Sequence, residues 1–431
     1  PANMQEASAW QQLAALRTPA GQALLTTAAE LASTAGTNPL ATASALRARA
    51  RQPGWQELTG GDPDKFHRLA AAALTQVELR SRAQLKFGSD ADRMFFTRAG
   101  LEQATRSTVA ARRAARLVAA GVRTLADLGC GIGADAIAAA RAGISVYAVD
   151  ADPNTAAVAE ANAAALGLTH LLRVDCRDAT TVDLSDVDAV FCDPARRDNR
   201  TGRRVFDPLA YSPPWDFVTE LPNRVSRTVL KLAPGIDHAL IPDGAEAEWV
   251  SVAGDVVEAA FWCGPLAEVP RRASLLPGGA ELTGSELTGS GVARAPVGKV
   301  RRFLFDPDGA VVRAHLVAEF AATVDGVLAD ESIAYVYTSR PSSTPYARCF
   351  EVLDVLPFSV KRLRAALRQR RVGRVDIHKR GSAVDVEALR RDLRLSGDTA
   401  ATVMLTRVAG APTALLCDPV KFDPVRLKPV R

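Results

Sequence analysis

The sequence lacks the features of a membrane or secreted protein. Its apolar runs, such as residues 144–149, are broken by charge or glycine well short of the ~20 residues that a membrane-spanning helix requires. Glu6, Gln11 and Gln12 interrupt the N-terminal stretch where a signal peptide needs a basic flank and an apolar segment. We therefore expect a cytoplasmic protein with no membrane partner.

Cysteine is sparse and scattered. The six cysteines among 431 residues form no CxxC pair and have no histidine nearby at the spacing of zinc ligands. We expect six reduced thiols, mostly buried, and no metal ion. Disorder of the whole chain is excluded, because 48% of its residues are hydrophobic and its mean hydropathy is +0.01. A chain of this length can bury a large core and predicts roughly three domains.

Acidic residues are scarce at the C-terminal end. Residues 340–431 carry 19 Lys and Arg against 9 Asp and Glu, whereas residues 1–339 carry 34 against 39. The net charge of +5 therefore comes from the C-terminal end. This asymmetry points to a polyanionic partner.

Apolar periodicity divides the chain into four parts. Residues 1–95 alternate alanine-rich helical patterns with breakers, which predicts an N-terminal helical domain. From Gly121, short apolar strands alternate with helical stretches, which predicts a parallel, doubly wound, Rossmann-like α/β sheet within residues 96–263. Residues 264–340 are expected to form a connecting β-rich segment, and residues 341–431 a compact α+β module.

Individual elements follow from the same patterns. The parallel strands are expected at 124–128, 145–149, 171–174, 189–192 and 228–232, with a hairpin over 249–261 at the edge of the sheet. In the connecting segment, strands at 300–305 and 311–313 flank an Asp-Pro-Asp-Gly turn signal. A basic helix is expected at 360–371.

A glycine-rich turn follows the first predicted strand. Gly129, Gly131 and Gly133 open a helix, so the backbone can turn tightly and approach a ligand at the helix N-terminus. Asp150 closes the next strand, where an acid can accept hydrogen bonds from both ribose hydroxyls of an adenosine. A dinucleotide and S-adenosylmethionine both fit this spacing, because Ala134 completes a G-x-G-x-x-A pattern.

Asp127 distinguishes the two cofactors. A carboxylate directed into the loop repels a pyrophosphate but can hold the cationic amino-acid part of S-adenosylmethionine, so we favour the latter; a glycine turn without a ligand is the remaining alternative. The run resembles the first motif of class I S-adenosylmethionine-dependent methyltransferases, acid-x-Gly-x-Gly-x-Gly. The resemblance implies a methyltransferase that binds this cofactor through Asp127, Gly129, Gly131, Gly133 and Asp150.

The resemblance implies two further cofactor contacts. In this family an acid after the third strand contacts the adenine amino group, and Asp178, followed by Ala179, is the preferred candidate, with Asp175 as the alternative. The upstream Phe-Phe-Thr-Arg run is similar to a segment that packs over the methionine end of the cofactor in RNA guanine methyltransferases of the trimethylguanosine-synthase type. Thr97 and Glu102 are therefore candidates, with helix capping as the structural alternative.

The end of the fourth strand carries the candidate catalytic residues. Asp193, Pro194 and Arg196 stand where class I enzymes that methylate a planar nitrogen carry Asp-Pro-Pro-Arg or a similar motif. An exocyclic amine is a poor nucleophile because its lone pair is delocalised into the ring. Hydrogen bonds to a carboxylate and to a backbone carbonyl before proline favour pyramidalisation and orient the lone pair. Ala195 departs from the motif and no aromatic residue follows, which leaves the nucleophile open.

Basic and aromatic residues after Asp193 are candidates for substrate binding. Guanidinium groups at the rim of the site suit a phosphate-bearing substrate, with a solvated basic loop as the alternative. The stacking group that the motif lacks is expected from Phe206, Tyr211 or Trp215. Residues 212–215 also copy a Ser-Pro-Pro-Trp catalytic motif, but no apolar parallel strand precedes them, so we favour Ser212 and the following proline as a helix start. The predicted contacts are Arg197, Arg200, Arg203, Arg204 and Trp215.

The basic helix of the C-terminal module has an unusual face. Lys361, Arg364, Arg368 and Arg371 share one side at helical spacing, and Asp354 is the only acid between residues 351 and 376, so the usual ion-pair partners are missing. Residues 345–417 resemble the THUMP-like domain found C-terminal to a group of bacterial class I methyltransferases. True THUMP domains deliver RNA, particularly tRNA, so the resemblance implies an RNA partner for these four residues.

Together these patterns predict an S-adenosylmethionine-dependent RNA methyltransferase that acts on a base nitrogen, with guanine N2 favoured, in tRNA or rRNA. A small-molecule or protein methyltransferase with the same cofactor site is the first alternative. A non-catalytic RNA-binding protein with a retained methyltransferase fold is the second.

Overall fold

The computed structural model describes residues 2–34, 38–50, 53–196, 210–284 and 293–422. The chain divides into two compact units, Pro1–Lys231 with Cys263–Leu266 and Leu232–Trp262 with Ala267–Arg431. Within the described ranges, no helix has the length and apolarity needed to cross a membrane.

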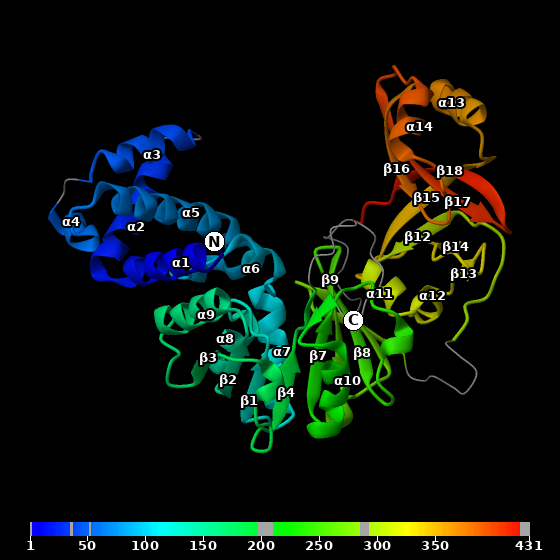
Figure 1. Cartoon of the computed structure of the whole chain (residues 1–431). Coiled ribbons are helices and arrows are strands. Elements are labelled where there is room, and N and C mark those ends of the chain that lie inside the picture. The colour runs from blue at the N-terminus through cyan, green and yellow to red at the C-terminus, as the bar shows by residue number, and fades with distance from the viewer. Residues whose placement is uncertain (1, 35–37, 51–52, 197–209, 285–292, 423–431) are drawn as a thin grey trace, which may run out of the picture. The chain divides into compact units, whose positions relative to one another are not determined.

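Five helices begin the first unit, as the alanine-rich pattern predicts. They are α1 (Ala2–Arg17), α2 (Pro19–Thr34), α3 (Pro39–Arg47), α4 (Pro53–Thr59) and α5 (Pro63–Phe87). The side chains of Asn38 and Asp62 each accept hydrogen bonds from two amides of the following first turn, and a proline occupies the first helical position. Leu24 and Phe66 are buried in this part, and Figure 1 shows its helices gathered together in blue.

Five neighbouring strands of one sheet belong to the first unit. They stand in the order β7-β4-β1-β2-β3, and each neighbouring pair is parallel. The strands are β1 (Thr124–Leu128), β2 (Ser145–Asp150), β3 (Leu172–Cys176), β4 (Ala189–Cys192) and β7 (Thr228–Leu232). The expected doubly wound sheet is confirmed. Its order reverses between β1 and β4, and in such sheets ligands bind at the carboxyl ends of the strands at this switch point.

Further helices and short elements precede or connect these strands. The helices are α6 (Arg98–Gln103), α7 (Ser107–Ala119), α8 (Ala134–Arg141), α9 (Pro153–Ala165) and α10 (Trp215–Arg224), with single turns η1 (Gly88–Asp92) and η2 (Ala179–Thr181). A two-stranded ribbon, β5 (Ala195–Arg196) paired with β6 (Tyr211–Ser212), follows β4. Strands β4 and β7 are buried over almost their whole length, which explains their nearly continuous apolar sequence.

The second unit contains the expected antiparallel hairpin, β8 (Glu246–Val252) with β9 (Asp255–Trp262). Strand β10 (Arg271–Leu276) pairs with β8 in parallel, and β11 (Ala280–Gly284) pairs with β10 in antiparallel orientation. The turns η4 (His238–Leu240) and η5 (Gly264–Leu266) precede β8 and β10 along the chain.

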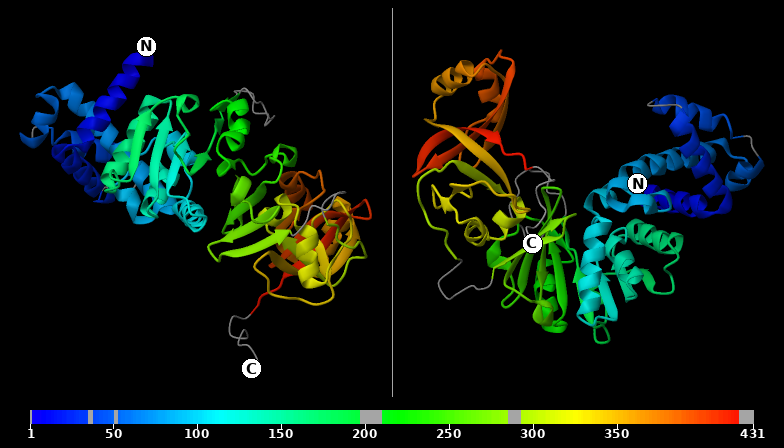
Figure 2. Two further views of the ribbon diagram at one scale, coloured as in Figure 1. Left: turned by 90° about the horizontal axis from the view of Figure 1, so that it is seen from below. Right: turned by 180° about the vertical axis from the view of Figure 1, so that it is seen from behind.

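A seven-stranded sheet completes the second unit. Its order is β13-β14-β12-β15-β18-β17-β16. The strands are β12 (Phe303–Pro307), β13 (Val327–Leu328), β14 (Val336–Thr338), β15 (Ala347–Pro357), β16 (Val372–Lys379), β17 (Thr399–Val408) and β18 (Ala411–Pro419). Helices α13 (Val360–Gln369) and α14 (Val386–Leu393) pack on it side by side, with Leu363, Leu367 and Leu389 in the shared core (Figure 2). Because β12 pairs with both β14 and β15, residues on either side of position 341 build one sheet.

Two expectations for the second unit are wrong. Residues 311–313 belong to a helix, α11 (Gly309–Arg313), and not to a strand, because Asp308 accepts a hydrogen bond from the amide of Ala310 and starts a helix; α12 (Val317–Val324) follows. The basic helix ends at Gln369 and not at 371, and Arg371 has a left-handed φ of 57°.

Candidate active site

The glycine turn after β1 has the tight conformation that its sequence predicts. Gly129, Gly131 and Gly133 have φ values of 85°, 58° and 97°, which favour glycine. The amide of Gly131 donates to Oδ2 of Asp150 at 3.1 Å. A Cβ atom at Gly129 would lie 3.6 Å from the carbonyl oxygen of Asp193. The ends of β1, β2 and β4 therefore meet around this turn.

Asp127 is the most unusual residue of this site. Its side chain is 1% exposed, and neither carboxylate oxygen has a hydrogen-bond partner in the described part of the chain. Burial, followed by the nearby charges of Asp135, Asp193 and Asp150, raises its pKa well above the usual value. A buried carboxylate without a partner is costly, and a cationic group of a ligand would compensate it.

Asp150 and Asp135 are two further carboxylates near the glycine turn. Asp150 accepts hydrogen bonds from the amides of Gly131 and Asp152 at 3.1 and 3.0 Å, while its burial raises its pKa. Asp135, in the first turn of α8, accepts from Thr105 Oγ1 at 2.6 Å and pairs with Arg113 Nε at 3.0 Å. Burial is the largest influence and raises the pKa of Asp135, but the charges of Arg113 and Lys231 and the hydrogen bonds from Thr105 and Arg113 together hold this pKa below the usual value. The sequence analysis missed this buried pair.

Asp193 follows β4 and is paired with a lysine that the sequence analysis also missed. Lys231 Nζ, on β7, lies 2.9 Å from Oδ2 of Asp193, and the two side chains are 12% and 33% exposed. A lysine within an otherwise apolar strand, Thr-Val-Leu-Lys-Leu, was the available signal. Oδ1 of Asp193 accepts no hydrogen bond from any described residue.

The residues that follow Asp193 belong to the short β5–β6 ribbon. Pro194 leads into the β5–β6 ribbon, in which the guanidinium of Arg196 lies 5.9 Å from the ring centre of Tyr211. Trp215 is 8% exposed and its ring centre lies 5.2 Å from that of Tyr211. Ser212 lies in β6 and does not cap α10, which begins after Pro214 without a side-chain cap; that expectation is wrong. A role for Trp215 in stacking on a substrate stays a prediction.

Two predicted cofactor residues have structural duties. Asp178 accepts hydrogen bonds from the amide and hydroxyl of Thr180 at 2.9 and 2.8 Å, which lowers its pKa, and it caps the turn that contains Ala179. Thr97 Oγ1 accepts from the amide of Gly100 at 2.9 Å and caps α6. Whether either residue also contacts a cofactor stays a prediction.

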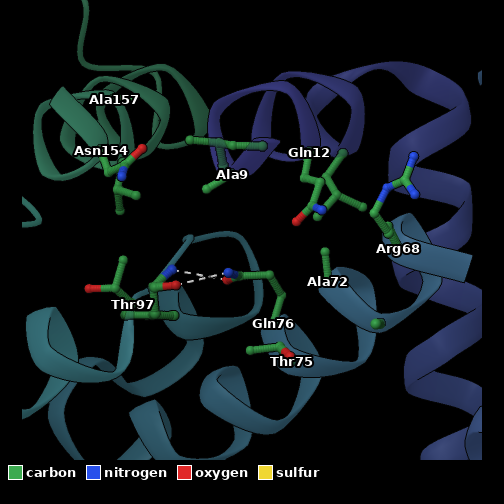
Figure 3. Close-up of a pocket in the computed structure, with 14 residues that line it drawn as sticks. Ala9, Gln12, Arg68, Ala72, Thr75, Gln76, Thr97, Asn154 and Ala157 are labelled. Carbon is green, nitrogen blue, oxygen red and sulfur yellow. Dashed lines mark hydrogen bonds between the residues drawn. The ribbon is translucent and has the colours of Figure 1, made fainter. Parts of the chain in front are cut away.

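Asn162 links the turn to the upstream segment and was missed. It is fully buried on α9, accepts from the amide of Phe95 at 2.7 Å, and donates to the carbonyls of Phe95 and Ile132 at 3.1 and 3.0 Å. Gln76 makes a similar pair of bonds with Phe96, drawn in Figure 3. Gln76 and Phe96, together with Thr97, line a cavity of about 460 Å³ in the first unit.

The predicted substrate arginines are only partly described. Arg197, Arg200, Arg203 and Arg204 lie outside the described residues. On and after α13, Arg364 and Arg368 donate to the backbone carbonyls of Asp392 and Arg394, and Arg371 pairs with Asp398 at 3.0 Å. Lys361 is exposed. Across the described residues, no group of three or more His, Cys, Asp or Glu is placed to hold a metal ion.

The sheet and the carboxylates at its glycine turn define a class I, Rossmann-like methyltransferase. The chain is 37% identical over 356 residues to an uncharacterised S-adenosylmethionine-dependent methyltransferase of Mycobacterium tuberculosis, found in strains CDC 1551 / Oshkosh and H37Rv; the match covers 79% of this chain and 95% of the relative. The methyltransferase domain family matches residues 125–201, and the THUMP domain-like family matches residues 347–419. The chain belongs to the S-adenosylmethionine-dependent methyltransferases.

A solved structure shows the same fold. A protein of Porphyromonas gingivalis W83 that was assigned as a methyltransferase matches 84% of this chain and 92% of its own chain, with a TM-score of 0.67 and 21% sequence identity. The residues present also fit S-adenosylmethionine, because the unpartnered carboxylate of Asp127 is an acceptor for its ammonium group, and nothing described lies within 4 Å of where a Cβ atom of Gly131 would stand.

Proposed function

We propose that this enzyme methylates a base nitrogen of RNA, with guanine N2 as the favoured atom and tRNA or rRNA as the substrate. The observation that carries the proposal is the placement of Asp193. Its carboxylate lies at the carboxyl end of β4 beside the glycine turn, is one-third exposed, and keeps Oδ1 open among the described residues. This is where an amine must be held during transfer.

S-adenosylmethionine, when bound, supplies a methyl group that its sulfonium already activates. Asp127 is the residue that would hold the ammonium group, and Asp150, at the end of β2, would accept hydrogen bonds from the ribose hydroxyls. The hydrogen bond that the amide of Gly131 donates to Asp150 fixes one oxygen of this carboxylate. These residues bind and orient; none of them has to accept a proton during the reaction.

Asp193 and Lys231 would act on the nucleophile. The lysine holds Oδ2 at 2.9 Å, so the carboxylate presents Oδ1 in one orientation. Oδ1 then accepts a hydrogen bond from the exocyclic amine and directs its lone pair, which is the contribution that orientation makes to catalysis. The proton that the methylated amine loses passes to Oδ1 or to solvent.

The second unit supports an RNA substrate. Arg364 and Arg368 donate to neutral carbonyls and not to carboxylates, so their positive charges are not cancelled, and Lys361 is exposed nearby. The THUMP domain-like family covers this region. An excess of uncancelled Lys and Arg charge is the electrostatic feature of proteins that bind phosphate backbones.

Two measurements on the full chain test the proposal. Isothermal titration with S-adenosylhomocysteine should show binding, and methyl transfer from tritiated donor to bulk RNA should label the RNA. A cofactor-binding protein that labels only small molecules or protein would contradict the RNA substrate. Failure to bind S-adenosylhomocysteine would contradict the cofactor site itself.

A further inference from the structure

A second cavity, of about 430 Å³, lies within the second unit. Its walls come from the chain between η4 and β8 and from the segment that leads into β10. The charged and titratable residues that line it are His238, Asp243, Glu268 and Arg271. None of the cofactor-site residues described above contributes to it.

Arg271 is the unusual residue of this cavity. It is 9% exposed, its Nη1 donates to the carbonyl of Pro270 at 2.8 Å, and its buried Nε has no partner in the described ranges. The next residue, Arg272, pairs with Glu246, Glu268 and Glu281, whereas no described carboxylate lies within ion-pair distance of Arg271. Its guanidinium therefore keeps an uncancelled charge and an unused donor, and this geometry matches an oxyanion.

Three stacked rings lie close to Arg271. The ring of His238 lies between those of Trp249 and His315. Its centre is 4.7 Å from the ring centre of Trp249, with an interplanar angle of 13°. It is 3.5 Å from the ring centre of His315, with an interplanar angle of 3°. Trp249 is buried, its Nε1 donates to the carbonyl of Pro234, and His238 Nε2 bonds the carbonyl of Arg313 at 2.7 Å. These bonds fix the inner rings. His315 ends the stack and is exposed.

Both histidines are neutral at neutral pH. Burial, as the largest cause, lowers the pKa of His238 to about 4 and also lowers the pKa of His315, and the positive charge of Arg271 lowers both further. Arg271 and His238 line the same cavity, and His315 stacks on His238, so the guanidinium lies near this ring stack. Two neutral imidazoles can stack without repulsion, and the outer ring then offers an uncharged π face.

We propose that Arg271 and His315 bind one nucleotide unit, with its phosphate on the guanidinium and its base on the ring face of His315 that is turned away from His238. Stacking on a ring tolerates any base, while the arginine requires the phosphate. Glu268 is already paired with Arg272, and Asp243 is exposed, so neither carboxylate of the cavity competes with the phosphate for Arg271.

Such a unit has two sources, a free nucleotide or a residue of single-stranded RNA. The second source deepens the proposed function and rests on it, whereas the first does not. Three probes distinguish them in titrations with the full chain: inorganic phosphate, guanosine 5′-monophosphate and a fluorescent single-stranded RNA decamer. If the wild-type protein binds the mononucleotide but not the decamer, the site takes free nucleotides.

The variants are Arg271→Gln, His315→Ala and His315→Phe, with Arg301→Gln, an exposed arginine of the same unit, as the matched control. We expect Arg271→Gln to weaken the binding of all three probes. His315→Ala should weaken the binding of the two nucleotide probes by about tenfold, because base stacking is worth ~1–3 kcal/mol. It should leave phosphate binding unchanged. His315→Phe should restore the nucleotide affinity.

Titration of each variant with S-adenosylhomocysteine shows that it is folded and separates the two claims. Normal cofactor binding with nucleotide affinities equal in Arg271→Gln, His315→Ala and Arg301→Gln would overturn the nucleotide site alone. A wild-type protein that binds none of the three probes at millimolar concentration would overturn it as well. Because His315 is exposed, its variants keep the test valid if Arg271→Gln does not fold.

Discussion

Replacing Asp127 by asparagine should have opposite effects on stability and on cofactor binding. In the free protein the buried carboxylate has no hydrogen-bond partner among the described residues, and its pKa is raised, chiefly by burial. In the unfolded chain Asp127 has its ordinary pKa of 3.8, so above about this pH it binds fewer protons there than in the folded protein. The free energy of unfolding therefore falls as pH rises. An asparagine at this position also lacks partners but cannot ionise, so Asp127→Asn removes only the cost of the buried charge and should raise this free energy at pH 7 by about 1–3 kcal/mol.

The same substitution should weaken the cofactor site. A hydrogen bond to a charged group is worth ~1.5–3 kcal/mol. Loss of the carboxylate that would face the ammonium should therefore weaken the binding of S-adenosylhomocysteine by about 10- to 150-fold. Urea unfolding with and without ligand, together with isothermal titration, measures both effects. At neutral pH the free variant should be more stable than wild type and gain less stability from the ligand.

Asp188→Asn is the matched control for this experiment. Asp188 lies near the opposite end of β1 and accepts hydrogen bonds from the amides of Arg123 and Thr124 at 2.8 and 3.1 Å, which lower its pKa. Its replacement should reduce stability at pH 7 and leave ligand affinity unchanged. The reasoning is refuted if Asp127→Asn destabilises the free protein or binds S-adenosylhomocysteine as tightly as wild type does.

Three further predictions concern the rest of the site and the basic helix. Asp193→Ala should abolish methyl transfer with nearly unchanged S-adenosylhomocysteine affinity, and Lys231→Met should lower kcat more than it raises the KM for the donor; equal losses of cofactor affinity in titrations would show that the pair is misassigned. Asn162→Leu should lower the free energy of unfolding by about 1–3 kcal/mol, because it leaves the buried amide of Phe95 without its partner, and urea unfolding unchanged from wild type would refute this. Lys361→Ala should weaken tRNA retention and reduce the slope of log affinity against log salt by about one if it contacts a phosphate; an unaltered slope would remove Lys361 from the interface.

The sequence predicts the parallel sheet because its strands are short apolar runs between breakers, and a sheet covered on both faces requires such runs. It predicts the glycine turn for a related reason, since Gly129, Gly131 and Gly133 adopt backbone conformations that other residues rarely adopt. The N-terminal helices follow from caps such as Asn38 and Asp62. Each of these features is encoded within a few neighbouring residues.

The features that were missed depend on contacts between distant residues. Lys231 meets Asp193 across 38 positions, and Asn162 meets Phe95 across 67, so no local spacing reveals either pair. The strand expected at 311–313 failed because Asp308 and Gly309 serve a helix start as well as a hairpin turn. The unpaired face expected on the basic helix is partly occupied, since Arg364 and Arg368 reach carbonyls at the end of α14 and beyond.

The most direct test of the account is methyl transfer to RNA by wild type and by Asp193→Ala, followed by nucleoside analysis. Wild type should place the tritium label in a base methylated on nitrogen, with N2-methylguanosine favoured, and Asp193→Ala should place none while it still binds S-adenosylhomocysteine. RNA that stays unlabelled by the wild-type enzyme, or equal labelling by both proteins, would contradict it.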